Sequence, residues 1–178
     1  MIVLKIISCA FALSFALVEL VLLRHGIAVE RAQGLDHPDR ELTTLGRQRT
    51  LQVCCRLHEL GLKFDCHYSS PYRRAQETAD LAVKSGLAPA MRIATCLQPG
   101  GDPWPLVQEL RGSCLFVGHE PDLSELASEL IGARSEALRL RKAGICHLRW
   151  SRDLHPNPRG LAQLQGLMSP RLLLPRSV

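Results

Sequence analysis

Short runs of apolar residues along this chain alternate with longer segments in which apolar residues recur every three or four positions. Three of the runs are typical of buried strands: residues 20–24, 64–68 and 115–117. The first run is apolar up to Arg24, which predicts a strand in the centre of a sheet. The segments between the runs have helical spacing, as Val53, Leu57 and Leu60 show. Strands that alternate with helices predict an α/β fold.

Residues with strong positional preferences mark the ends of the predicted helices. Thr43 or Thr44 is placed to cap the first helix, and Gly61 is placed to end it. For the second helix, Ser70 is a suitable N-cap and Pro71 suits the first helical position. Each helix therefore has a predicted start close to the end of a strand or loop.

The last third of the chain predicts one more helix and two more strands. Glu120-Pro121 opens the helix, and residues 145–150 and 161–167 indicate strands joined by a proline-rich turn, which favours an antiparallel pair. We therefore expect a single three-layer α/β domain over residues 19–175. Its sheet is expected to be mostly parallel, with helices on both faces and an antiparallel strand near the C-terminus.

Composition is that of an ordinary globular protein, with 46% hydrophobic and 22% charged residues in 178. Aromatic residues make up only 4%, so no stacking platform for nucleic acid is expected. The net charge of +5 is uneven: nine Lys or Arg and two acids follow Ala133. This basic third either steers an acidic or phosphorylated partner or is simply a solvated surface.

The seven cysteines are odd in number and contain no CxxC pair. Several lie inside apolar runs, which predicts reduced, buried thiols rather than a disulfide framework or a zinc site. A cytoplasmic location is the expectation that follows. The cysteines are at positions 9, 54, 55, 66, 96, 114 and 146.

Residues 1–18 form an extra segment ahead of the expected domain. Lys5, the apolar run 6–18 and Ser14-Phe15-Ala16 together resemble a secretory signal peptide, which would make the protein exported. The run is too short for a comfortable transmembrane helix, so no membrane partner is expected. The alternative is a start annotated too far upstream, with Val18 as the initiator. We favour that alternative, because unpaired core cysteines suit an exported protein badly.

Three polar clusters follow predicted strands, at residues 24–26, 69–74 and 118–121. Open α/β sheets bind ligands at the carboxyl ends of their strands, so a parallel sheet brings these clusters together. The result is a pocket with two histidines and at least two arginines. Arginine forks match phosphate oxygens, and a neutral imidazole can attack phosphorus. No Asp-rich metal site or Walker-type loop is visible, so we expect no metal and no cofactor.

The segment Leu22-Leu23-Arg24-His25-Gly26 resembles the RHG signature of the histidine phosphatase superfamily, branch 1. Further landmarks of that family follow in order at residues 42–46, 69–79 and 117–119. Small size, residues 24–28 and the late segment 167–170 are most similar to the SixA-type phosphohistidine phosphatases. The resemblance covers about residues 19–175.

This resemblance implies a role for each matching residue. His25 would be the nucleophile, Arg24 and Arg73 would bind phosphate oxygens, and His119 would donate a hydrogen bond to the same phosphate. Gly26 would let the chain turn without crowding the phosphate. Arg74, next to Arg73 on a helix, is expected to point elsewhere, at the surface.

The proton donor is the role that the sequence leaves open. Asp102 and Glu120 are the candidates, although both also fit as helix N-caps. The absence of an obvious donor suits phosphohistidine, since a protonated imidazole leaves phosphorus readily.

Three functions are compatible with these residues. The leading hypothesis is a phosphatase for phosphohistidine on a histidine phosphotransfer protein or domain, acting in signal transduction. The second is a phosphatase for small phosphoesters such as sugar phosphates, and the third is a non-catalytic phosphate-binding module. The short chain has no long insertion to enclose a metabolite, which favours the first. Both histidines and both arginines being present speaks against the third.

Overall fold

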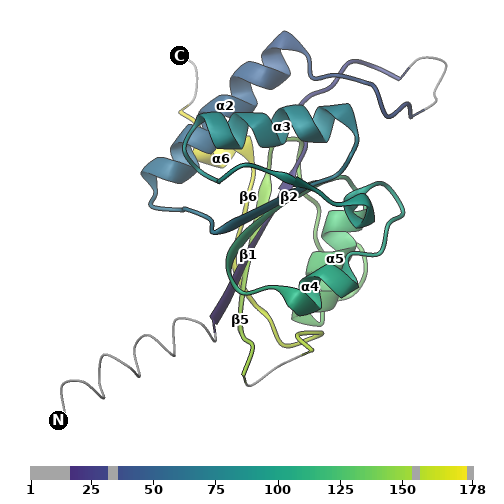
Figure 1. The fold of residues 1–178 in the computed structure, drawn as a ribbon, viewed down its shortest axis with the longest axis vertical. Coiled ribbons are helices and arrows are strands. Elements are labelled where there is room, and N and C mark those ends of the chain that lie inside the picture. Colours follow the sequence, from purple (N-terminus) through teal and green to yellow (C-terminus); the bar gives the residue numbers. More distant parts are fainter. Residues whose placement is uncertain (1–16, 32–35, 154–156, 176–178) are drawn as a thin grey trace.

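The computed structural model describes residues 17–31, 36–153 and 157–175. Its centre is a six-stranded sheet in the order β3-β2-β4-β1-β5-β6 (Figure 1). The strands are β1 (Leu17–Arg24), β2 (Cys66–Ser69), β3 (Arg92–Ile93), β4 (Gly112–Gly118), β5 (Ile145–Ser151) and β6 (Gln163–Met168). Strands β1 to β4 are parallel, and β5 runs antiparallel to both of its neighbours. The expected mostly parallel sheet with an antiparallel strand near the C-terminus is confirmed.

Helices cover both faces of this sheet, as predicted (Figure 1). Helices α2, α3 and α6 lie on one face, and α4 and α5 lie on the other. Their bounds are α2 (Thr44–Glu59), α3 (Arg73–Lys84), α4 (Trp104–Glu109), α5 (Asp122–Ile131) and α6 (Pro170–Leu173), with a 3-10 turn, η2, at Thr95–Leu97.

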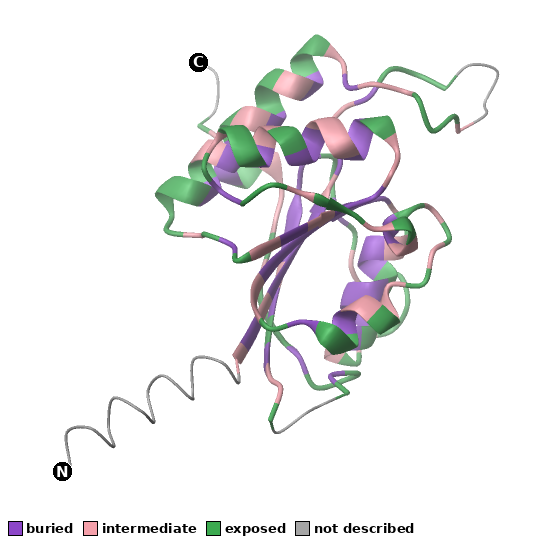
Figure 2. Cartoon of the chain, in the orientation of Figure 1, coloured by how far each residue is buried: buried purple, intermediate pink, exposed green. Residues whose placement is uncertain are grey.

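The central strand β1 shows why both faces need cover. Leu20 and Leu22 point into the core under α5, while Val21 and Leu23 point into the core under α2 and α3. All four are fully buried. The central strands of the sheet are accordingly coloured as buried over much of their length (Figure 2). Burying each such side chain stabilises the fold by about 1.5–3 kcal/mol. The strand begins at Leu17, three residues before the predicted start, because it pairs with Ser151 of β5 from there on.

The structure confirms one predicted helix start and contradicts another. Thr43 caps α2 by accepting a hydrogen bond from the Gly46 amide, and Gly61 follows the helix with φ of 88°, as expected. Helix α3, however, begins at Arg73, so the assignment of Ser70 as its N-cap is wrong. The Ser70 hydroxyl instead accepts from the Tyr72 amide, which makes a turn before the helix.

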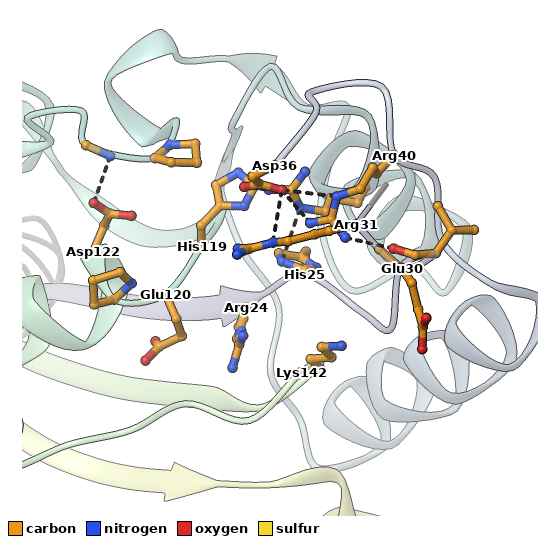
Figure 3. A pocket seen from close by; sticks show the side chains of 16 residues that line it. Arg24, His25, Glu30, Arg31, Asp36, Arg40, His119, Glu120, Asp122 and Lys142 are labelled. Carbon is orange, nitrogen blue, oxygen red and sulfur yellow. Dashed lines mark hydrogen bonds and ion pairs between the residues drawn. The ribbon is translucent and has the colours of Figure 1, made fainter. Parts of the chain in front are cut away.

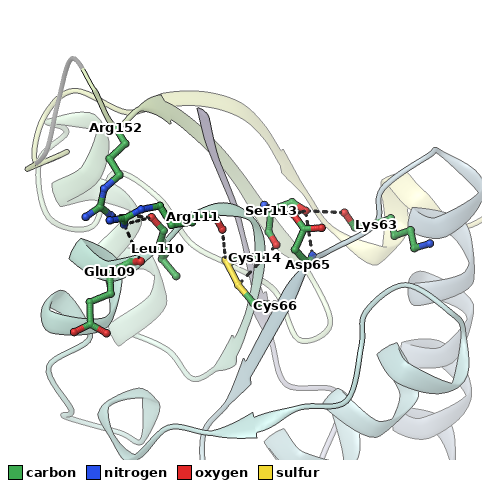
Figure 4. Close-up of a disulfide and its surroundings, with 9 residues drawn as sticks. All are labelled: Lys63, Asp65, Cys66, Glu109, Leu110, Arg111, Ser113, Cys114 and Arg152. Atoms are coloured by element: carbon green, nitrogen blue, oxygen red, sulfur yellow. Dashed lines mark hydrogen bonds between the residues drawn. A yellow bond between two sulfur atoms is a disulfide. The ribbon is translucent and has the colours of Figure 1, made fainter. Parts of the chain in front are cut away.

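The cysteine prediction is wrong for one pair. Cys66 and Cys114 face each other in the register of β2 and β4, with 4.7 Å between their Cα atoms, and form a disulfide (Figure 4). That separation lies in the range that disulfides require. Strand register decides such a pairing, and register is not visible in cysteine spacing. The described free thiols are Cys54, Cys55, Cys96 and Cys146, while Cys9 lies outside the described residues.

The N-terminal extension also falls outside the described residues, up to position 16. Within the part of the chain that is described, no helix has the length and apolar character needed to cross a membrane. The cytoplasmic location stays a prediction.

Candidate active site

A cavity of about 590 Å³ opens where β1 and β4 end (Figure 3). Both histidines of the predicted site lie in it, together with five cationic side chains and four carboxylates. The cations are Arg24, Arg31, Arg40, Arg74 and Lys142, and the carboxylates are Glu30, Asp36, Glu120 and Asp122. The strand ends therefore do bring distant clusters together, as expected for a parallel sheet.

His25 follows β1 and is held as a neutral, buried imidazole. Its Nδ1 lies 2.8 Å from the carbonyl oxygen of Gly26, so Nδ1 carries the hydrogen and donates it. Nε2 is left with a lone pair, which accepts a hydrogen bond from Arg74 Nε at 3.3 Å. Burial, with the neighbouring His119 and the charges of Arg74 and Arg24, lowers the pKa of His25 to about 2, against the opposing Gly26 hydrogen bond. This state is the one a nucleophilic imidazole requires.

His119 follows β4, and its ring centroid lies 5.2 Å from that of His25. Its Nε2 is 2.7 Å from the Ser70 hydroxyl, which accepts from the Tyr72 amide. Among the described residues this hydroxyl has no other acceptor for its proton, so it donates to Nε2. The ring hydrogen is then on Nδ1, a buried atom without a hydrogen-bond partner among the described residues. Burial, then the charge of Arg74, lowers the pKa of His119 to about 3. A neutral donor is thus available for a phosphoryl oxygen.

Arg74, not Arg73, is the arginine of α3 that reaches this site. The Arg74 side chain is 2% exposed, and besides His25 it binds Asp36 at 2.8 Å and the carbonyl of His37 at 3.3 Å. A cation beside the nucleophile can bind the incoming phosphate. The expectation that Arg74 points to the surface is wrong.

Arg73 is placed outside the cavity. Its side chain is 53% exposed and pairs with Glu41 at 2.7 Å and Glu77 at 3.1 Å. The expected contact between Arg73 and phosphate is therefore not supported by its position.

Helix phase explains the exchange, and the packing of α3 against the sheet sets that phase. The buried stripe of α3 contains Ala75, Ala79 and Ala82. Arg74 precedes that stripe by about 100° of rotation and Arg73 by about 200°, since a helix turns once in 3.6 residues. Arg74 therefore lies beside the buried face, and Arg73 lies opposite it.

Arg40 is a second arginine of the cavity that the sequence motifs do not predict. Its Nε lies 3.0 Å from Asp36 Oδ1, and its terminal nitrogen donates to the Val29 carbonyl at 2.7 Å. An antiparallel bridge between Ala28 and Leu42 folds this loop back beside His25. A loop arginine has no periodic signal, so only the folded chain could identify it.

Arg24 lies in the cavity, as predicted. One terminal nitrogen donates to the Leu140 carbonyl at 2.8 Å, and its buried Nε has no partner within the described ranges. Burial lowers the pKa of Arg24, and the nearby Glu120 carboxylate opposes that shift. The guanidinium keeps donors for an anion.

Gly26 has a different role from the one expected. It does not line the cavity: its amide donates to Thr78 Oγ1 at 3.0 Å, and a Cβ would come within 2.3 Å of Thr50 Oγ1. The residue must be glycine because the chain packs closely against α2, rather than to make room for phosphate.

The two candidate proton donors are also separated by the fold. Asp102 lies outside the cavity lining, and its carboxylate accepts from the Trp104 amide at 3.0 Å, where α4 begins. Glu120 lines the cavity, 2.8 Å from the Ser124 hydroxyl. Burial raises the pKa of Glu120, against the Ser124 hydrogen bond and the charge of Arg24. Of the two candidates, Glu120 is the one that lines the cavity.

Residues 17–31, 36–153 and 157–175 contain no group of three or more His, Cys, Asp or Glu side chains able to hold a metal ion.

Comparisons with known proteins agree with the histidine and arginine site that the geometry shows. The family described as histidine phosphatase superfamily (branch 1) matches residues 20–94. An uncharacterized protein of Picosynechococcus sp. is 35% identical in an alignment of 175 positions that covers 88% of this chain and 99% of the relative.

Two solved structures share the fold. One is the protein histidine phosphatase SixA complexed with tungstate, with a TM-score of 0.74 and 22% identity, covering 85% of this chain and 97% of the other. The other is a putative alpha-ribazole-5'-P phosphatase from Escherichia coli, with a TM-score of 0.68 and 21% identity, covering 87% and 98%.

Proposed function

Because this chain belongs to branch 1 of the histidine phosphatase superfamily, we propose that it removes phosphate from phosphohistidine on a phosphotransfer protein. The observation that carries the proposal is the neutral His25 imidazole, whose unprotonated Nε2 accepts a hydrogen bond from the Arg74 guanidinium. A nucleophile and a phosphate-binding cation lie in direct contact. A phosphatase reaction of this family needs both groups.

The reaction proceeds in two displacements. In the first, His25 Nε2 attacks phosphorus, the bond between phosphorus and the substrate imidazole breaks, and a phosphohistidine forms on His25. In the second, water attacks the same phosphorus, and inorganic phosphate leaves as the His25 imidazole is restored. Arg24, Arg74 and the Nδ1 hydrogen of His119 stabilise the charge on the equatorial oxygens in both steps.

The leaving group decides how much acid catalysis is needed. An imidazole that carries a proton departs without further help, whereas an alkoxide needs a proton in the transition state. Glu120 is our candidate to supply that proton, because it lines the cavity and burial raises its pKa. The site is thus equipped for a phosphohistidine and carries one group that an ester would use.

A basic loop beside the cavity supports a protein substrate. Arg139, Arg141 and Lys142 are exposed, and none forms an ion pair with a described carboxylate. The buried Leu140 anchors the loop, through its carbonyl to Arg24 and its amide to the Ser124 hydroxyl. A cationic rim attracts the acidic surface of a partner protein more than it attracts one small phosphoester.

A small phosphomonoester is the second candidate. The fold is shared with the putative alpha-ribazole-5'-P phosphatase as well as with SixA, so the fold alone does not choose between the substrates.

The test is a side-by-side assay of purified enzyme at matched substrate concentrations. The substrates are a phosphorylated histidine phosphotransfer domain, free phosphohistidine and a panel of sugar phosphates. We expect the highest kcat/KM on the phosphorylated domain and no turnover by the His25→Ala variant. A higher kcat/KM on a sugar phosphate would replace our proposal with the second candidate.

A further inference from the structure

Asp36 places a carboxylate inside the cationic site. Its Oδ2 lies 2.8 Å from an Arg74 terminal nitrogen, and its Oδ1 accepts from both Nε and a terminal nitrogen of Arg40. The Asp36 side chain is 27% exposed and lines the cavity (Figure 3). One carboxylate therefore bridges the two arginines that the folded chain adds to the site.

Every nitrogen of these two guanidiniums is already engaged by the protein. Arg74 donates to His25, to the His37 carbonyl and to Asp36. Arg40 donates to the Val29 carbonyl and, with its other two nitrogens, to Asp36. A phosphoryl group that binds the edge of Arg40 formed by Nε and the terminal nitrogen that donates to Asp36 must therefore replace the Asp36 carboxylate.

The charges around Asp36 favour its ionised form. Burial opposes ionisation, but the hydrogen bond from Arg40 and the charges of Arg74, Arg40 and Arg31 outweigh it and lower the pKa of the carboxyl. The Asp36 carboxylate thus places a single negative charge between arginines that are suited to bind a phosphoryl group with two. A carboxylate and a phosphate accept the same bidentate hydrogen bonds from arginine.

We propose that Asp36 is an internal competitor of the substrate phosphate. Its carboxylate accepts the hydrogen bonds of Arg40 Nε and of one terminal nitrogen each of Arg40 and Arg74 until a phosphoryl dianion displaces it. Arg31, at 3.8 Å and 58% exposed, offers the displaced carboxylate a partner at the rim. The residue therefore sets phosphate affinity and favours release of product phosphate.

The proposal rests on phosphate binding in this cavity and not on which molecule carries the phosphate. Its test therefore uses inorganic phosphate as the probe. Apparent affinity falls in proportion to the fraction of molecules whose binding site is available. An Asp36 that leaves the arginines in about one molecule in ten weakens phosphate binding about tenfold.

The experiment compares Asp36→Asn with Asp39→Asn by calorimetric titration with inorganic phosphate at pH 7.5. Asp39→Asn is the matched control, because it removes the same charge from the same loop. The Asp39 side chain is 81% exposed, and its ion-pair partner among the described residues is His37. We expect the Kd for phosphate to fall about tenfold in Asp36→Asn and less than twofold in Asp39→Asn. Thermal unfolding of both variants checks the fold, and Asp36→Ala is the second variant.

Weaker phosphate binding by both Asp36→Asn and Asp36→Ala, with wild-type unfolding, would overturn the proposal, since it would mean that Asp36 supports the arginines rather than competing. An equal gain in both asparagine variants would also overturn it, because the effect would then be one of net charge. A failure of the phosphohistidine substrate assay leaves this binding result unaffected, so the two proposals fail separately.

Discussion

Replacing Arg74 by methionine is expected to lower kcat/KM by about 10²- to 10³-fold. Arg74 Nε is 3.3 Å from His25 Nε2, so a phosphoryl group on that nitrogen lies close to the guanidinium. Two unit charges 4 Å apart attract by about 4 kcal/mol at an effective dielectric constant of about 20. Removing one preorganised donor from a transition state typically costs about 2.7–4 kcal/mol, which corresponds to the same range in rate.

The matched control is Arg73→Met, one position earlier on the same helix. Arg73 pairs with Glu41 and Glu77 at an exposed site, and such pairs contribute about 0–1 kcal/mol to stability. We expect this variant to keep wild-type kcat/KM and to unfold within a few degrees of the wild type. Both variants are assayed by phosphate release from the preferred substrate, with thermal unfolding as the check on the fold.

The opposite pattern would refute the placement of α3. If Arg73→Met lost activity while Arg74→Met kept it, the helix phase described above would be wrong. Equal, small effects in both variants would show that neither guanidinium stabilises the transition state.

Three further predictions test the titration, the proton donor and the basic loop. Stability is expected to fall as the pH drops from about 6.5 towards 3, because unfolded His25 binds a proton there and the folded residue does not, at a cost of about 1.4 kcal/mol per pH unit. The lowered pKa of His119 adds a similar slope, so His25→Asn should remove only part of the pH dependence measured by denaturant unfolding. An equal reduction by His58→Asn, an exposed control, would contradict the cause. Glu120→Gln should lower kcat on a sugar phosphate, whose alkoxide leaving group needs a proton, by about 10²-fold, the lower end of acid catalysis, while sparing phosphohistidine. Equal losses on both substrates would remove Glu120 as the ester-specific donor. The double variant Arg139→Glu, Arg141→Glu should lower kcat/KM about tenfold on a phosphorylated protein domain and weaken the salt dependence of that kcat/KM. Its kcat/KM on free phosphohistidine should not change. Equal losses on both substrates would show that the loop attracts the phosphate group and not the protein that carries it.

Much of the architecture was predictable because it depends on short-range preferences. The apolar run before Arg24 predicts β1, and the Thr43 cap and Gly61 bound α2 within two residues. The end of a buried strand is also where a parallel sheet gathers ligand groups, which is why His25 and His119 were identified correctly as neighbours.

The remaining features depend on contacts between distant parts of the chain. Helix packing decides that Arg74 and not Arg73 faces the nucleophile, strand register decides that Cys66 meets Cys114, and the return of a loop brings Asp36 to the arginines.

The sequence by itself determined the α/β class, the central strand and the residue types that handle phosphate, because periodicity and motif order are written along the chain. Only the tertiary structure decided which cation binds beside His25, which carboxylate lies inside the site and which only makes a turn ahead of a helix. Those outcomes are set by the three-dimensional direction of each side chain, and that direction follows from packing rather than from position in the sequence.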